Sequence, residues 1–256
     1  MTLHFNNTDI YFFAKGTSNP LVLLHGFLES SEIWEPFIES LAAKRQVVCI
    51  DLPGHGQSGN IGETHTMELM ADVVVAVLGQ LNITTAVFVG HSMGGYVSLA
   101  MAEKFPGMIK GLVLMNSSPI EDSKEKRINR EKSIALVRKN KEAYVKMAIT
   151  GLVAPKNKTR FKDEIDELTT RALQMEELGI IAALKGMKIR TNKELVLKRL
   201  TIMKIYVFGN QDPIISPYIA ESVGKSGHCL IKNISGGHLS YLENKDEIEK
   251  MMYFID

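Results

Sequence analysis

Four short runs of consecutive apolar residues in the first half of the chain are separated by segments with a helical pattern. The runs are Leu21–Leu24, Val47–Asp51, Ala86–Gly90 and Gly111–Met115. Strands buried on both faces of a parallel sheet have this composition. The segments between them predict helices at about 32–43, 65–80 and 94–105. The chain is therefore expected to be an α/β protein, with right-handed crossovers that place helices on both faces of a mostly parallel sheet.

Four further segments with a strand pattern bring the predicted sheet to eight strands. They are Leu3–Phe5, Asp9–Ala14, Ile202–Phe208 and Cys229–Ile234. The first two flank Asn6-Asn7-Thr8 and predict a hairpin. A last helix is expected over about 243–254.

The middle of the chain has a different character, with no convincing strand between residues 117 and 200. Amphipathic helices are expected at about 122–139, 141–151, 161–175, 177–188 and 192–199. This organisation predicts an all-helical cap, or lid, over residues 117–200. The cap would be inserted into an α/β core formed by residues 1–116 and 201–256.

Charge divides along the same lines. Residues 117–200 hold 20 Lys and Arg against 12 Asp and Glu, whereas the whole chain of 256 residues has a net charge of only +1. The balanced total argues against nucleic-acid or anionic-membrane partners. The basic residues of the middle are expected mainly on solvated helix faces. The alternative is that some of them line the mouth of a cleft and favour acidic esters or acyl groups.

Localisation and metal content are predicted from what the sequence lacks. Cys49 and Cys229 lie in apolar, strand-like runs and are expected to be buried. Two thiols exclude a disulfide scaffold and cannot form a zinc site alone. The start of the chain has no signal-peptide pattern, and the apolar stretch Ala71–Leu81 is too short to span a bilayer. A cytoplasmic protein without metal or cofactor, a monomer or small homo-oligomer, is expected.

Gly90-His91-Ser92-Met93-Gly94 follows a predicted buried strand and opens a predicted helix. The pattern matches the G-x-S-x-G nucleophile elbow, in which a sharp turn exposes the serine hydroxyl at the top of a sheet. Gly90 and Gly94 allow the backbone to pass closely on both sides of Ser92. The sequence therefore predicts Ser92 as a nucleophile, with His91 beside it in the supporting loop.

A serine nucleophile needs a base, and the base needs an acid to orient it. His238 lies in the loop between the last strand and the last helix, and Asp212 follows the strand Ile202–Phe208. These positions predict His238 as the base and Asp212 as the acid. A known variation places the acid after the preceding strand, and Glu121 and Asp122 are the nearest carboxylates there. They stay alternatives to Asp212.

The loop His25-Gly26-Phe27 follows the strand Leu21–Leu24 and predicts part of an oxyanion hole. One backbone N–H is expected from this loop and one from the residue after the nucleophile, which makes Phe27 and Met93 the predicted donors. A further loop, Asp51–Ser58, is expected to have a structural role, with Asp51 binding backbone N–H groups.

Taken together, these motifs resemble the α/β-hydrolase superfamily over residues 1–116 and 201–256. The resemblance implies a serine hydrolase, and we expect a carboxylesterase (EC 3.1.1) that cleaves small esters through an acyl-enzyme. Relatives that open epoxides or remove halide carry aspartate at the elbow, where this chain has Ser92. The menaquinone-pathway lyases carry arginine after a pair of glycines. This chain has the pair as Gly94-Gly95 but follows it with Tyr96, which weakens the resemblance to those lyases without removing it.

Several other activities remain open because they use the same three residues. They are a C–C bond hydrolase or lyase, a thioesterase, a lactonase and an aminopeptidase. A ligand-binding receptor with slow turnover is the alternative from another class. In each enzyme case the expected partner is a small-molecule ester or acyl substrate.

Overall fold

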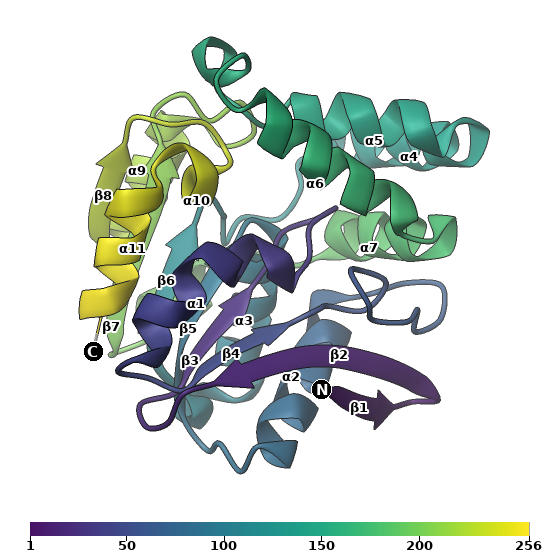
Figure 1. Ribbon diagram of the computed structural model, residues 1–256. Coiled ribbons are helices and arrows are strands. Elements are labelled where there is room, and N and C mark those ends of the chain that lie inside the picture. Colours follow the sequence, from purple (N-terminus) through teal and green to yellow (C-terminus); the bar gives the residue numbers. More distant parts are fainter. Residues whose placement is uncertain (256) are drawn as a thin grey trace.

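The computed structural model describes residues 1–255 and contains an eight-stranded sheet in the order β1-β2-β4-β3-β5-β6-β7-β8 (Figure 1). Its strands are β1 (Thr2–Phe5), β2 (Thr8–Lys15), β3 (Leu21–Leu24), β4 (Val47–Ile50), β5 (Ala86–His91), β6 (Ile109–Met115), β7 (Met203–Gly209) and β8 (Leu230–Ile234). The pairs β1–β2 and β2–β4 are antiparallel. All other neighbouring pairs are parallel. The predicted α/β class and mostly parallel sheet are confirmed.

The central strands are buried because both of their faces are covered. Every residue of β3, β4 and β5 is buried, as their unbroken apolar runs predict. At the edge of the sheet, β1 and β2 form the predicted hairpin. Its turn residues Asn6 and Asn7 have φ values of 48° and 60°, a left-handed conformation that asparagine tolerates better than most residues.

Helices cover both faces of the sheet. In Figure 1, α1 and α11 lie in front of it, whereas α2 and α3 lie behind it. The α-helices outside the segment between β6 and β7 are α1 (Glu35–Ala42), α2 (Met67–Gln80), α3 (Met93–Lys104), α9 (Pro217–Ser226), α10 (Ser240–Glu243) and α11 (Lys245–Phe254). Short 3-10 turns are η1 (Ser31–Trp34), η2 (Pro106–Met108) and η3 (Pro155–Asn157).

Three sequence expectations near the C-terminus differ from the structure. The α9 helix was not predicted from the sequence, and it exposes two large side chains, Tyr218 (82%) and Ile219 (45%). The last helix is interrupted at Asn244 and becomes α10 and α11. Cys229 lies just before β8 and not within it. It is only half-buried, because β8 is the last strand of the sheet and has a neighbouring strand on one side only.

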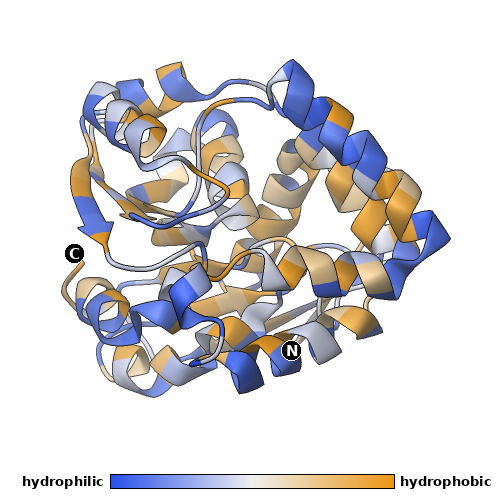
Figure 2. Ribbon diagram, turned by 90° about the horizontal axis from the view of Figure 1, so that it is seen from above, coloured by the Kyte–Doolittle hydropathy of each residue, from blue (hydrophilic) through white to orange (hydrophobic). Residues whose placement is uncertain are grey.

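The segment between β6 and β7 contains five α-helices, which we refer to as the inserted helices. They are α4 (Lys124–Lys139), α5 (Lys141–Thr150), α6 (Lys162–Gln174), α7 (Glu177–Ile189) and α8 (Glu194–Arg199). Contacts link α5 to both α4 and α6, and α4 to α7. Seen from above, hydrophobic and hydrophilic positions alternate along these helices (Figure 2), as expected where one helix face is buried.

The α7 helix packs directly against the core loop between β4 and α2, and no space is left between them for additional atoms. A Cβ atom added at Gly179 would lie 2.8 Å from the carbonyl oxygen of Gly54, and one added at Gly186 would lie 1.7 Å from that of His65. The backbone N–H of His65 donates to the carbonyl oxygen of Ala182 at 3.0 Å. The backbones of α7 and the core loop are therefore in direct contact.

Candidate active site

Ser92 occupies the turn between β5 and α3 with φ 48° and ψ −112°. A non-glycine residue in such a conformation costs about 1–3 kcal/mol, and the surrounding structure must hold it. Its N–H donates to the carbonyl oxygen of Met115 at 2.9 Å. Its carbonyl oxygen accepts from the Ser117 hydroxyl at 2.8 Å and from Gly95 N–H at 3.0 Å. The end of β6 thus holds the turn in place.

The glycines on either side of Ser92 allow this close packing. A Cβ atom added at Gly90 would lie 2.5 Å from the carbonyl carbon of Gly94, and one added at Gly94 would lie 2.3 Å from the carbonyl oxygen of Leu24. Both distances are too short for real atoms. The turn therefore requires glycine at both positions, as the elbow pattern predicts.

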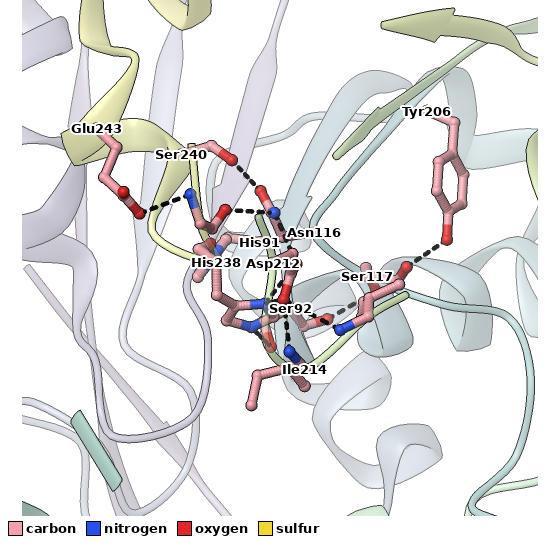
Figure 3. A network of polar contacts seen from close by, with 12 residues as sticks. His91, Ser92, Asn116, Ser117, Tyr206, Asp212, Ile214, His238, Ser240 and Glu243 are labelled. Atoms are coloured by element: carbon pink, nitrogen blue, oxygen red, sulfur yellow. Dashed lines mark hydrogen bonds and ion pairs between the residues drawn. The ribbon is translucent and has the colours of Figure 1, made fainter. Parts of the chain in front are cut away.

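The structure brings Ser92, His238 and Asp212 together (Figure 3). His238 Nε2 lies 2.8 Å from Ser92 Oγ. On the other side of the ring, His238 Nδ1 lies 3.0 Å from Asp212 Oδ1 and 2.9 Å from Oδ2. His238 is 2% exposed and Asp212 is 7% exposed, while Ser92 is only half-buried. The hydroxyl can therefore be reached while its partners are shielded from water.

Asp212 is held as a carboxylate by several donors. Its Oδ1 accepts from the N–H groups of Ile214 at 2.8 Å and Ile215 at 3.0 Å. Burial alone would raise the pKa of Asp212, but the His238 ring, the Asn116 amide and the Ile215 N–H outweigh it and lower the pKa. A negative charge beside Nδ1 favours the orientation in which Nε2 faces Ser92.

Asn116 was not identified from the sequence, although it lies where the acid stands in the known variation. Its Nδ2 donates to Asp212 Oδ2 at 2.8 Å and to the carbonyl oxygen of Gly237 at 3.1 Å. Its Oδ1 accepts from the Ser240 hydroxyl. Asn116 thus links the acid to the loop that carries the histidine. The only signal in the sequence was its place directly after the strand Gly111–Met115.

The loop that carries His238 also touches the segment between α5 and α6. The backbone N–H of His238 donates to the carbonyl oxygen of Leu152 at 2.9 Å. Glu243 accepts from Gly237 N–H at 2.9 Å and from Asn157 Nδ2 at 2.7 Å. The inserted segment therefore contributes directly to the surroundings of this histidine.

The backbone N–H groups of Phe27 and Met93 are the predicted oxyanion donors. Among residues 1–255, no protein acceptor is hydrogen-bonded to the backbone N–H of Phe27 or of Met93. The N–H of Gly26 is already bound to Glu29 Oε2 at 2.6 Å. His25 Nδ1 lies 2.7 Å from the Gly26 carbonyl oxygen, and His25 Nε2 accepts from Leu52 N–H. The side chain of His25 therefore supports the loop.

The loop Asp51–Ser58 has the structural contacts that the sequence predicts. Asp51 Oδ1 accepts from Ser31 N–H at 2.7 Å, and its Oδ2 accepts from Gln57 N–H at 2.8 Å. His55 is fully buried, with its ring near those of His25 and Phe27. Burial lowers the pKa of His55 well below its ordinary value, and the neighbouring His25 adds to this shift.

The alternative acids do not contact His238. Asp122 Oδ1 accepts from Arg190 at 2.6 Å, and its Oδ2 accepts from Arg130 at 2.9 Å. No hydrogen bond or ion pair found among residues 1–255 joins Glu121 to His238. Asp122 instead fixes the start of the inserted helices. The Arg190 guanidinium also lies 4.1 Å from the ring centre of Tyr96.

Several basic residues between β6 and β7 pair with acidic residues from other parts of the chain. Lys193 bonds Glu103 and lies 3.2 Å from Glu68. Arg171 lies 3.1 Å from Glu32. Basic residues of the segment 117–200 thus form ion pairs with acidic residues of the rest of the chain where the two regions touch. The sequence did not reveal this role for the basic residues.

Two further properties concern the described part of the chain as a whole. Within residues 1–255, no group of three or more His, Cys, Asp or Glu side chains is arranged to hold a metal ion. Nor does any helix there combine the length and apolar character needed to cross a bilayer.

Comparison with known proteins identifies the family. Residues 19–201 match the sequence pattern described as alpha/beta hydrolase fold. This segment includes Ser92 and all five inserted helices. The chain belongs to the α/β-hydrolase family. The matched segment ends before Asp212 and His238, whose proximity to Ser92 is known from the structure alone.

Solved structures similar to this α/β hydrolase include enzymes of several kinds. A thermophilic esterase from Thermogutta terrifontis has a TM-score of 0.91 and 27% identity, covering 96% of this chain and 92% of that one. An enol-lactonase from Burkholderia xenovorans LB400 has a TM-score of 0.90 and 18% identity, covering 98% and 97%. The second likeness shows the fold alone.

Curated relatives match over shorter segments. A putative carbamate hydrolase, RutD, of Serratia proteamaculans (strain 568) is 33% identical over 142 residues, which is 54% of this chain and 53% of that protein. The first four such relatives match over 28% to 53% of their own length. The α/β hydrolase described here thus spans about half or less of the length of the curated relatives it matches first.

Proposed function

We propose that this protein is a serine hydrolase that cleaves small carboxylic esters through an acyl-enzyme. The observation that carries the proposal is the 2.8 Å separation of Ser92 Oγ and His238 Nε2, with Asp212 on the other ring nitrogen. Nucleophile, base and orienting acid are thus within hydrogen-bond distance. The similarity to a thermophilic esterase supports the same substrate class.

The mechanism follows from the roles that these positions allow. His238 accepts the proton of Ser92 Oγ as the oxygen attacks the ester carbonyl, and the Asp212 carboxylate stabilises the imidazolium that forms. The N–H groups of Phe27 and Met93 bind the oxyanion. His238 then gives its proton to the leaving alkoxide, which leaves Ser92 acylated. A water molecule repeats the steps and releases the acid.

The inserted helices act as a cap over this site in the proposed mechanism. The contact of Leu152 with His238 brings the segment between α5 and α6 to the base itself. A cap in this position excludes bulk water during the acyl-enzyme stage and limits the size of the acyl group. The proposed domains are those expected from the sequence: a cap of residues 117–200, inserted into a core formed by residues 1–116 and 201–256.

Turnover of p-nitrophenyl acetate and butyrate tests the proposal, with Ser92→Ala as the inactive variant. Ser226→Ala on α9 is the matched control, because this distant hydroxyl only donates to the carbonyl oxygen of Val223. We expect hydrolysis by the wild type and the control, loss of hydrolysis in Ser92→Ala, and an acyl mass on the Ser92 peptide after acid quenching. Equal, slow rates in all three proteins would refute catalysis and favour a ligand-binding receptor.

The leaving group is tested with a matched series. An oxygen ester, a thioester and an anilide of the same acyl group, together with a lactone of matched chain length, share the attack by Ser92. They differ in the leaving group, which is a free alkoxide, a thiolate, an amine or an alkoxide still attached to the acyl chain. We expect the oxygen ester to give the highest kcat/KM. A higher value for any other member would reassign the enzyme to a thioesterase, a lactonase or an amide hydrolase.

A further inference from the structure

A second pair of a buried carboxylate and a buried imidazole lies beside Ser92 and His238. Glu29 Oε2 and His91 Nδ1 are 2.8 Å apart, and both side chains are 1% exposed. The pair joins the loop after β3 to the end of β5. The ring of His91 lies 5.2 Å from that of His238, between centres. The mechanism proposed above uses neither Glu29 nor His91.

Both ring nitrogens of His91 face hydrogen-bond acceptors. Nδ1 faces the carboxylate of Glu29, and Nε2 lies 2.9 Å from the backbone carbonyl oxygen of His238. A neutral imidazole carries one N–H and can satisfy only one acceptor, whereas an imidazolium carries two and satisfies both. The geometry therefore matches a protonated His91.

The charges around His91 agree with this protonation. Burial alone would lower the pKa of His91, but the Glu29 carboxylate, the His238 carbonyl oxygen and the more distant Asp212 outweigh it and raise the pKa. Burial would raise the pKa of Glu29, and the charge of His91 reverses this and lowers it. Tyr241, whose ring lies 5.2 Å from that of His91, also faces the pair, and His25 interacts with both of its members.

Glu29 extends the pair to the oxyanion loop. Its Oε2 accepts from the backbone N–H of Gly26 at 2.6 Å, and its Oε1 accepts from the Tyr241 hydroxyl at 3.1 Å. Gly26 precedes Phe27, a proposed oxyanion donor. One chain of contacts thus runs from Gly26 through Glu29 and His91 to the backbone of His238.

We propose that Glu29 and protonated His91 are positioning residues that hold the oxyanion loop and the backbone of His238 in their relative places, and that loss of the His91 proton sets the alkaline limit of turnover. The proposal rests on the hydrolytic function proposed above. Once His91 is neutral, either Glu29 or the His238 carbonyl oxygen loses its buried donor. The loop and the base are then free to move apart, and small displacements of reacting groups are costly.

The kinetic test compares kcat and KM over pH for the wild type, Glu29→Gln and two controls. The Glu29→Gln substitution keeps the size of the side chain but removes the negative charge that holds the proton on His91. We expect the alkaline limb of kcat to move to lower pH by about one unit or more. At the optimum we expect kcat to fall by about tenfold, with KM nearly unchanged, because oxyanion placement acts on the transition state.

The controls separate the protonation of His91 from the ionisation of Tyr241 and from a general change of charge in the loop. Tyr241→Phe removes one hydrogen bond to Glu29 and a group that ionises at high pH, but leaves the pair intact. Glu32→Gln makes the same change of charge in the adjacent turn η1, at a residue that pairs with Arg171 instead. We expect the alkaline limb of both controls to coincide with that of the wild type. A shift in Tyr241→Phe equal to that in Glu29→Gln would overturn the assignment to His91.

A spectroscopic test does not depend on turnover. Ring ¹⁵N chemical shifts of histidine in the Ser92→Ala protein report protonation directly, with the His91 signals assigned from their absence in a His91→Gln variant. We expect a protonated His91 at neutral pH, and a neutral one when Glu29→Gln is added. A neutral His91 at pH 7 would refute the proposal. If His91 is protonated but no ester is hydrolysed, the proposed function fails, and the pair is a structural ion pair only.

Discussion

The Nδ2 atom of Asn116 lies 2.8 Å from the Oδ2 atom of Asp212, so a neutral amide at the end of β6 supports the carboxylate at the end of β7. The same amide also reaches the carbonyl oxygen of Gly237. Acid and histidine therefore share one support, although their loops are separate in the sequence.

Replacing Asn116 tests this support. Its φ is 47°, so Asn116→Gly removes the amide without straining the backbone. We expect kcat to fall by about tenfold with little change in KM, because Asp212 and the His238 loop lose a common donor. Ser240→Ala is the control, since it leaves both donations of Asn116 in place. A kcat of wild-type size in Asn116→Gly would show that Asp212 needs no such support.

The strained turn at Ser92 predicts a gain in stability when glycine replaces it. Ser92→Gly and Ser92→Ala both remove the nucleophile, but only glycine adopts φ 48° readily. We expect Ser92→Gly to be more stable than Ser92→Ala by about 1 kcal/mol or more in urea unfolding. Equal midpoints for the two inactive variants would mean that the turn stores no strain.

The buried ion pairs of Asp122 predict a pH-dependent contribution to stability. Burial would raise the pKa of Asp122, but Arg130 and Arg190 outweigh it and lower the pKa below the ordinary value of 3.8. The carboxylate therefore stabilises the fold fully above about pH 4, and this contribution is lost as the pH falls through the lower folded value.

The corresponding variant is Asp122→Asn. We expect it to lower the free energy of unfolding at pH 7 by about 3 kcal/mol, because two arginines lose their charged partner. The difference from the wild type should shrink under strongly acidic conditions. Glu125→Gln, an exposed position on α4, is expected to change stability by less than about 0.5 kcal/mol. A difference that stays constant down to the lowest pH would contradict the assigned charge.

The pairing of basic residues between β6 and β7 with carboxylates predicts little preference for anionic esters. Arg130, Arg171, Arg190 and Lys193 all have carboxylate partners. We expect kcat/KM for matched neutral and anionic esters to differ by less than about tenfold and to vary little with salt. A strong preference for the anionic ester that disappears at high salt would instead support an electropositive entrance.

The sequence predicted most of the sheet because its central strands are buried on both faces and have unbroken apolar runs. Ser92, Asp212 and His238, which the structure brings together, were also named from the sequence, since each lies in a short local motif. Glu29 and Asn116 were missed because their partners lie 62 and 96 residues away. No local pattern distinguishes a polar residue with a distant buried partner from one in a solvated loop.

The contact between Gly54 and Gly179 has a consequence for how such enzymes can be recombined. Each glycine fills the space that a side chain on the other would need, so neither position can change alone. A chimera that takes its inserted helices from a relative must therefore also take the facing core loop, including residues 54 and 65. In this protein, the segment that must be replaced together is therefore larger than the segment between β6 and β7.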